Sequence, residues 1–251
     1  MTATCALDSE AEHSDIVTRV SRLSRSAKLT LGYVGLAALD AWLSGSSDQR
    51  LQRARVVTKP LLMPVLTASL ATDPEARRSP LFASTVVAQA FGWGGDVLLL
   101  REGTEAFAAG AGSFGVGHLS YITGFRRRRN RNQPLGSSRV GRIAKALVAT
   151  GGPTMAIGAA REELVLGPAV LGYTGLLSGM LAHAGNLDPA LPAPARRRIL
   201  AGAALFAASD TLLGLRHFWW KKAPARAESV VMVTYTAGQL LISRGTARAA
   251  R

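Results

Sequence analysis

The sequence is poor in cysteine and in charged residues. Its single cysteine, Cys5, excludes a disulfide framework and a metal cluster held by several thiolates. Charged residues make up 18% of the chain, below the roughly 25% that is usual in globular proteins. The first 27 residues carry four acidic side chains and lack an apolar stretch, so we expect no secretory signal peptide there. These shortages argue against a disulfide-stabilised domain and against an ordinary soluble one.

The net charge of +14 invites comparison with nucleic-acid-binding proteins. The basic residues are distributed among separate polar segments, however, and no nucleic-acid-binding module is recognisable. This distribution agrees better with the excess of Lys and Arg in the cytoplasmic loops of membrane proteins. We therefore expect membrane lipids as partners and no nucleic acid.

Hydrophobic residues make up 48% of the chain and fall into apolar runs separated by short polar stretches. Most runs have about 17 to 22 residues, the length that a helix needs to cross the hydrocarbon core of a bilayer. The sequence therefore predicts an all-α, polytopic membrane protein with about eight transmembrane helices. They are expected at 28–44, 56–72, 80–100, 105–125, 140–160, 164–183, 197–217 and 227–243, within a domain of residues 28–243 between a polar N-terminal segment (1–27) and a basic tail (244–251).

Two thirds of the 30 Lys and Arg residues lie on the side of the predicted bundle that holds both chain ends. The positive-inside rule therefore places both termini in the cytoplasm, at the plasma membrane if the protein is bacterial. The run Arg126–Arg129, in the connection between the fourth and fifth helices, contributes most to this excess. We expect it to face anionic lipid headgroups. Within the fifth helix, Pro153 predicts a bend, because proline lacks the backbone donor that a helix needs.

At least four ionisable side chains lie inside the predicted spans, among them Asp40, Asp96, His118 and Asp210. A charged residue such as aspartate costs about 2.5 to 3.5 kcal/mol at the centre of a bilayer, so it is kept only with a partner or a use. With the predicted orientation, the three aspartates and Lys59 all fall in the non-cytoplasmic half of the membrane. This common depth predicts a shared polar cavity.

Structural explanations exist for several of these residues. Asp40 could form an ion pair with Lys59 that makes its insertion tolerable, or it could contact a substrate. His118 could simply form a hydrogen bond between helices. Because Lys59 can neutralise one carboxylate well but not three, we expect Asp96 and Asp210 to be functional.

Polar and small residues also recur at helical spacing on single faces of two predicted helices. Gln89, Gly92 and Asp96 lie on one face of the third helix. Tyr235 and Gln239 lie one turn apart on the eighth helix. We expect these faces to point into the bundle.

Five segments of the chain resemble the signatures of the YhhN family of membrane lysoplasmalogenases. They are Lys59–Pro64, Phe91–Leu99, the Phe-x-x-Gly-x-x-x-Phe-x-x-x-His-x-x-Tyr pattern of Phe107–Tyr121, Gly202–Leu213 and Tyr235–Ile242. The ordered set spans about residues 28–243. It implies an eight-helix membrane hydrolase that cleaves the vinyl ether bond of lysoplasmalogen, a lysophospholipid. The products are a fatty aldehyde and glycerophosphoethanolamine or glycerophosphocholine.

The resemblance also implies that Asp96 and Asp210 are the functional aspartates. One departure is the absence of a small hydroxyl residue just before Asp96, which leaves a hydroxyl hydrogen bond to this carboxylate in doubt. Further candidates are Lys59, for neutralising a carboxylate or binding the substrate phosphate, and a set that could orient the glycerol and headgroup. That set consists of His118, Tyr121, Tyr235 and Gln239, with Asp40 as a further substrate-binding candidate.

The chemistry of vinyl ether hydrolysis suits two carboxyl groups. Protonation of the β-carbon gives an oxocarbenium ion, which water captures, and the resulting hemiacetal releases the aldehyde and an alcohol. A low dielectric favours the protonated form of a carboxylic acid. A second carboxylate can stabilise the cation and activate water. Either aspartate could be the acid, and we expect no metal and no cofactor.

Two other functions are compatible with the same residues. Carboxylates at a common depth also suit a proton-coupled transporter of a small molecule or a lipid, although no inverted repeat of the kind that many carriers have is evident. A non-catalytic membrane scaffold, whose polar residues merely pair with each other, is the third possibility.

Overall fold

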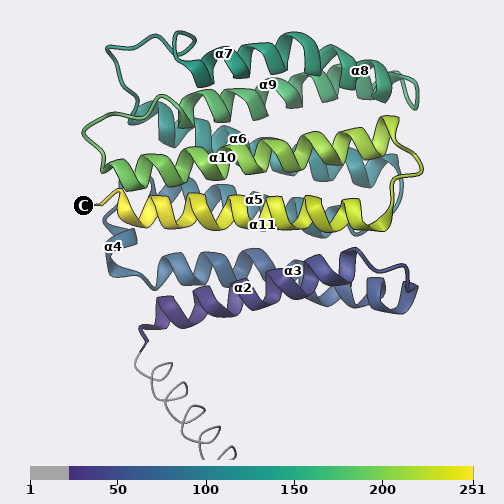
Figure 1. The fold of residues 1–251 in the computed structure, drawn as a ribbon, viewed down its shortest axis with the longest axis horizontal. Helices are drawn as coiled ribbons and strands as arrows, with labels where there is room; N and C mark the ends of the chain where they lie inside the picture. The colour runs from purple at the N-terminus through teal and green to yellow at the C-terminus, as the bar shows by residue number, and fades with distance from the viewer. Residues whose placement is uncertain (1–22, 251) are drawn as a thin grey trace, which may run out of the picture.

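The computed structural model describes residues 23–250, which form a bundle of helices (Figure 1). The prediction of an all-α fold is confirmed, and each of the eight predicted helices overlaps one long helix or broken helix. Seven long helices are α2 (Arg25–Ser44), α3 (Gln49–Ala71), α5 (Phe82–Leu98), α6 (Thr104–Arg127), α9 (Leu166–Ala184), α10 (Ala193–Gly214) and α11 (Ala225–Arg248). The broken helix consists of α7 (Arg139–Ala146), η1 (Leu147–Gly151) and α8 (Gly152–Ala160), while α4 (Pro74–Arg77) is short and η2 (Leu215–Trp219) extends α10. Cys5 and most of the polar segment predicted for 1–27 lie outside the described residues.

Several helices extend beyond the predicted apolar runs. The α3 helix begins at Gln49 instead of residue 56, because the side chain of Asp48 caps it by accepting a hydrogen bond from the Arg50 amide at 2.8 Å. The α11 helix continues to Arg248, so the tail predicted from residue 244 is largely helical. Hydropathy locates the apolar part of a helix, whereas capping determines where the helix begins and ends.

Neighbouring helices lie side by side along a common axis (Figure 1). The contacts run from α2 to α3, α5, α6, α9, α10 and α11 and back to α2, so these helices form a closed ring. The broken helix packs outside this ring, against α9. The start of α2 and the C-terminus lie at the same end of the bundle (Figure 1), where the hydroxyl of Ser26 donates to the Ser69 carbonyl at 2.7 Å.

This end of the bundle, which we call the basic end, carries most of the positive charge. Among the described residues it holds Arg25, Lys28, Arg77, Arg78, Arg126–Arg129, Arg131, Arg139, Arg142, Lys145, Arg196–Arg198, Arg244 and Arg248. The run Arg126–Arg129 is fixed against the α9–α10 connection. The Asn130 amide donates to the Asn186 carbonyl, and the Asp188 amide donates to the Arg128 carbonyl, both at 2.8 Å.

Large apolar side chains are exposed around the outside of the bundle. Trp42 of α2 is 62% exposed, Val57 of α3 is 64% exposed and Ile157 of α8 is 53% exposed. Two helices, Arg139–Ala160 and Ala193–Trp219, are long and apolar enough to cross a membrane. The remaining predicted spans fall short of that measure: α5 has 17 residues, and in the others Ala, Gly, polar and charged residues dilute the apolar character.

The bend predicted at Pro153 takes the form of a π-helical turn. The η1 turn precedes α8, and Pro153 lies in the first turn of α8. Proline lacks the N–H that the preceding turn requires, and π-helical turns are one way in which a helix absorbs such a defect. Within α3, Pro64 likewise deprives the Pro60 carbonyl of its helical donor. The indole Nε1 of Trp93 donates to that carbonyl at 3.0 Å and replaces the missing bond.

Glycine allows two pairs of helices to approach closely. A Cβ atom on Gly202 of α10 would lie 2.6 Å from the carbonyl oxygen of Gly238 on α11. A Cβ atom on Gly95 of α5 would lie 2.5 Å from the ring of Phe114 on α6. Small residues at such contacts are typical of helices that pack backbone against backbone.

We predict that Gly202→Val destabilises the protein by about 1–3 kcal/mol, because its side chain would force α10 away from α11. Thermal unfolding of the purified protein measures the effect. Gly35→Val on α2 is the matched control, since a Cβ atom there has nothing within 4 Å. Equal unfolding temperatures for the two variants would contradict the close α10–α11 contact.

Candidate functional site

The sequence-predicted site residues are gathered inside the bundle in three polar groups. The Asp96 group consists of Lys59, Asp96, Tyr121, Tyr235 and Gln239. The Asp210 group consists of His118, Tyr173 and Asp210. The Asp40 group consists of Asp40, Arg55, Thr58, Arg216 and Glu228.

Asp96 is a buried carboxylate on α5 whose two oxygens both have partners. The hydroxyl of Tyr235 on α11 donates to Oδ2 at 2.8 Å. The Nζ atom of Lys59 on α3 lies 3.7 Å from Oδ1. Tyr235 thus makes the hydroxyl hydrogen bond that the local sequence around Asp96 left in doubt. Because a buried charge requires a partner, Lys59 and Asp96 stabilise each other inside the bundle.

Tyr121 and Gln239 extend the Asp96 group. The Tyr121 hydroxyl of α6 donates to Oε1 of Gln239 on α11 at 2.8 Å. Gly92 of α5 faces Tyr235 and Gln239 of α11. A Cβ atom on Gly92 would lie 3.5 Å from the Tyr235 hydroxyl and 3.6 Å from Nε2 of Gln239. The predicted inward faces of α5 and α11 are therefore confirmed, and they meet each other.

Asp40 belongs to a different network. It is fully buried on α2, accepts a hydrogen bond from the Thr58 hydroxyl at 2.6 Å and lies 3.5 Å from Nη2 of Arg55. The alternative in which Asp40 pairs with Lys59 is wrong. Because α3 begins earlier than predicted, it presents Arg55 to Asp40, while Lys59 one turn later reaches Asp96.

The Asp40 network continues to the start of α11. Arg55 lies 3.3 Å from Oε1 of Glu228, and Glu228 also pairs with Arg216 of η2. The acidic and basic side chains are balanced in this chain of contacts, which links α2, α3, α11 and η2. We interpret the network as structural, since its charges neutralise each other where the helices meet.

Asp210 of α10 is held by two side chains from neighbouring helices. The hydroxyl of Tyr173 on α9 donates to Oδ2 of Asp210. The Nε2 atom of His118 on α6 lies 3.1 Å from the Tyr173 hydroxyl and 3.6 Å from the same Asp210 oxygen. Sequence reasoning missed Tyr173, although it is the one tyrosine in the otherwise apolar and small α9 sequence.

The same heavy-atom positions in the Asp210 group accommodate two arrangements of protons. In one, Tyr173 donates to an Asp210 carboxylate and accepts from the Nε2–H of His118. In the other, a protonated Asp210 donates to Tyr173, whose hydroxyl donates to a bare Nε2 of His118. A histidine supports either arrangement because each ring nitrogen can donate or accept. The three groups can therefore pass a proton between Asp210 and His118.

Asp210 lines the cavity described below and Asp96 does not, so the two carboxylates do not share the wall of this cavity. The ring of Phe206 lies between their partners, with its centroid 5.3 Å from that of Tyr235 and 4.9 Å from that of His118. Across residues 23–250, no hydrogen bond or ion pair joins the two groups. Both carboxylates point inward, but an aromatic side chain fills the space between them.

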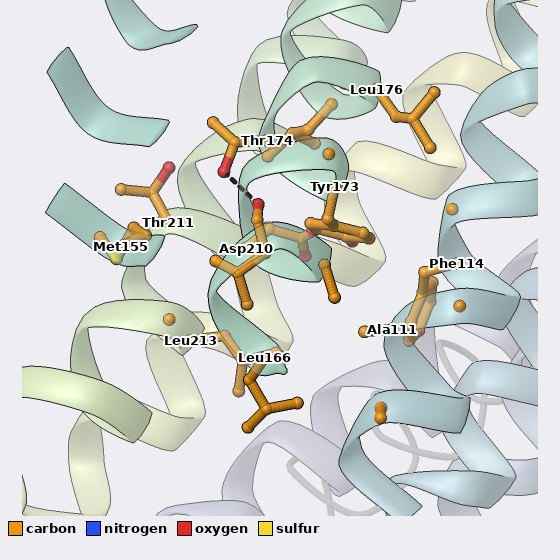
Figure 2. Close-up of a pocket in the computed structure, with 18 of the residues that line it drawn as sticks. Ala111, Phe114, Met155, Leu166, Tyr173, Thr174, Leu176, Asp210, Thr211 and Leu213 are labelled. Atoms are coloured by element: carbon orange, nitrogen blue, oxygen red, sulfur yellow. Dashed lines mark hydrogen bonds between the residues drawn. The ribbon is translucent and has the colours of Figure 1, made fainter. Parts of the chain in front are cut away.

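A cavity of about 410 Å³ lies beside Asp210, enclosed by α6, η1, α8, α9, α10 and η2. Its walls are mainly apolar, and Figure 2 shows Asp210 and Tyr173 among residues such as Phe114, Leu166 and Leu213. The side chains with polar atoms on its wall are Tyr173, Thr174, Ser178, Asp210 and Thr211. The structure describes all the site residues predicted from the sequence. Among them, Asp210 is the one that lines this cavity.

The candidate site is thus a carboxyl group with two proton-transferring partners at an apolar cavity. Within the described part of the chain, no three His, Cys, Asp or Glu side chains cluster so that they could hold a metal ion. The arrangement can exchange a proton with a molecule in the cavity, whose walls are mainly apolar.

Comparison with known proteins identifies the family. The model of the YhhN family matches residues 54–246. No curated protein and no solved structure matches the chain. The matched region contains the Asp96 and Asp210 groups and the cavity, whereas Asp40 lies before it. Because the match covers most of the chain, the protein belongs to the YhhN family.

Proposed function

We propose that the protein is a membrane-embedded hydrolase that cleaves the vinyl ether bond of lysoplasmalogen, or of a related lysolipid. The observation that carries this proposal is Asp210, with Tyr173 and His118, on the wall of an apolar cavity of about 410 Å³. A cavity of this size lies within the range of small-molecule sites, roughly 300–1,000 Å³. Its apolar wall suits a hydrocarbon chain, and membership of the YhhN family suggests a lysoplasmalogenase.

Several features support a location in the membrane. Apolar side chains are exposed around the bundle, as on α2, α3, α8 and α11, and such surfaces require an apolar partner. The long helices approach the length of about 20 residues that spans a bilayer. Basic residues gather at the end that holds the start of α2 and the end of α11. We therefore propose a multi-pass protein whose basic end and both termini face the cytoplasm.

In this proposal, Asp210 acts directly on the substrate. Its protonated carboxyl group donates the proton to the β-carbon of the vinyl ether, and the ether oxygen stabilises the resulting cation as an oxocarbenium ion. Water then adds to the α-carbon and returns a proton to the Asp210 carboxylate. The hemiacetal separates into a fatty aldehyde and a glycerophospho-alcohol, so the net reaction consumes one water molecule.

Tyr173 and His118 support Asp210 in this scheme. Tyr173 holds the Asp210 oxygen in place, and His118 accepts or supplies a proton through the Tyr173 hydroxyl. General acid–base catalysis of this kind requires a group that can take either protonation state, and the two arrangements of the Asp210 group meet that requirement.

Asp96 acts as a positioning residue rather than as the second acid. Its hydrogen bond fixes Tyr235, whose ring packs against Phe206, and Phe206 in turn packs against His118. Lys59 balances the Asp96 charge. Tyr121 and Gln239 belong to the same group, so we propose a supporting role for them instead of headgroup binding.

The reaction class is tested by incubating the purified protein with lysoplasmalogen and, in parallel, with an ester lysophospholipid. We expect aldehyde release from the first lipid and no fatty acid release from the second, because ester cleavage does not proceed through protonation of a carbon–carbon double bond. Fatty acid release without aldehyde would contradict the proposal, as would transport of intact lipid across proteoliposomes without any chemical change.

We predict that Asp210→Asn lowers the rate of aldehyde release by about 10²–10⁴-fold, the usual contribution of a general acid. Tyr173→Phe removes one hydrogen bond to a charged group and lowers the rate by roughly 10–100-fold. Tyr33→Phe is the control, since Tyr33 is a buried tyrosine whose hydroxyl donates to the Thr236 carbonyl and makes no hydrogen bond to Asp210. Equal rates for the two Tyr→Phe variants would remove Tyr173 from the mechanism.

The role of Asp96 is tested by a double-mutant cycle. Asp96→Asn leaves the Lys59 charge buried without its partner, so we expect a loss of about 3–5 kcal/mol in the free energy of unfolding. Lys59→Met together with Asp96→Asn removes both charges and restores most of that stability. A positioning role predicts that the stable double variant still releases aldehyde. If this variant is as inactive as Asp210→Asn, Asp96 takes part in the chemistry itself.

A further inference from the structure

Helices α5 and α11 meet along a row of polar and small residues. Near one end, the Tyr235 hydroxyl donates to Asp96 at 2.8 Å. Near the other end, the hydroxyls of Thr85 and Thr246 are 2.9 Å apart. These contacts belong to the most deeply buried part of the bundle, since all four side chains are at most 4% exposed. A continuous polar contact therefore extends along the interior of a largely apolar bundle.

The contacting residues keep the same register along both helices. The number of residues from Thr85 to Asp96 on α5 equals the number from Tyr235 to Thr246 on α11. Between these two contacts, Gly92 of α5 faces Gln239 of α11. With a rise of about 1.5 Å per residue, the shared length is roughly 16 Å. We call this row the α5–α11 seam. It consists of Thr85, Gln89, Gly92 and Asp96 on α5 and of Tyr235, Gln239, Ser243 and Thr246 on α11.

Two polar atoms of the seam are buried without a hydrogen-bond partner. They are Nε2 of Gln89 and the hydroxyl oxygen of Ser243. Gln89 is 0% exposed and Ser243 is 1% exposed. The hydroxyl of Thr67 on α3 donates to Oε1 of Gln89 at 2.9 Å. The donor side of the amide is therefore left to another partner.

The register places these two unpartnered groups close to each other. Gln89 stands opposite Ile242, the residue before Ser243. Ile242 packs towards α10, where a Cβ atom on Gly202 would lie 2.8 Å from its Cγ1 atom. Because Ile242 packs towards α10, Ser243 is the next polar residue of α11 in this register, on the same face of the helix as Gln239 and Thr246. The two groups have the donors and acceptors that one small polar molecule could bridge.

An amide and a hydroxyl that are buried without partners each cost about 1–3 kcal/mol. Proteins avoid this cost by enclosing water molecules, which make about three hydrogen bonds to such groups. We propose that the α5–α11 seam is a water-binding site, with ordered water bound between Gln89 and Ser243. This site lies about two helical turns from Asp96.

Radiolytic hydroxyl labelling tests the water site without any assay of activity, because bound water produces radicals beside the residues that it touches. Met63 borders the seam, with its sulfur 3.9 Å from a Cβ atom placed on Gly92. Met180 is equally buried but lies on α9, away from the seam. We expect Met63 to be oxidised at least several times faster than Met180 in the intact protein, as measured by mass spectrometry.

The variant Gln89→Leu with Ser243→Ala removes both unpartnered groups. We expect the oxidation rate of Met63 in this variant to fall to that of Met180. Equal rates for the two methionines in the unmodified protein overturn the proposal, and so does a double variant that folds and labels Met63 as before. The comparison in the unmodified protein holds even if the double variant does not fold. Fast Met63 labelling in a protein that releases no aldehyde would reject the hydrolase and retain the water site.

Discussion

The buried ion pair between Lys59 and Asp96 organises the polar interior of this bundle. A buried cation or carboxylate is costly without an opposite charge, and Lys59 and Asp96, both nearly inaccessible, face each other. Their contact therefore fixes α3 against α5, and the Tyr235 hydroxyl adds α11 to the same point. With these helices in place, Arg55 of α3 is directed to Asp40 and the α5–α11 seam acquires its register. The pair determines a framework, and in the proposed function the chemistry belongs to a neighbouring group.

That neighbouring group differs from the Asp96 group in its access to space. Asp210 lines a cavity, whereas Asp96 is enclosed by its partners and by the ring of Phe206. Two aspartates of the same family signatures can thus have different tasks. One carboxyl group borders a cavity, and the other is paired with a cation inside the packed bundle. The ring of Phe206 packs against a partner of each carboxylate.

Much of the fold could be predicted from the sequence, because apolar runs and helical periodicity are local properties. The positions of the helices, the irregularity at Pro153 and the inward direction of Gln89, Asp96 and Asp210 all followed from such patterns. The early start of α3 depends on the Asp48 cap, which hydropathy does not detect.

The contacts between helices could not be read in the same way. A sequence shows that two carboxylates share a depth, but whether they meet depends on which side chains fill the space between them. Phe206 separates them here. Tyr173 escaped notice for a related reason: its importance comes from α9 lying next to α10, and no local pattern around Tyr173 shows that adjacency.

The indole of Trp93 has a consequence for how this chain can vary. Its N–H bonds the Pro60 carbonyl only because Pro64, one turn later, has no N–H to offer. Any other amino acid at position 64 would close the helical bond and leave the indole competing for the same oxygen. A phenylalanine at position 93 would leave the Pro60 carbonyl without the hydrogen bond that the indole donates. The proline and the tryptophan lie on different helices, but their effects are coupled, because both determine which donor bonds the Pro60 carbonyl.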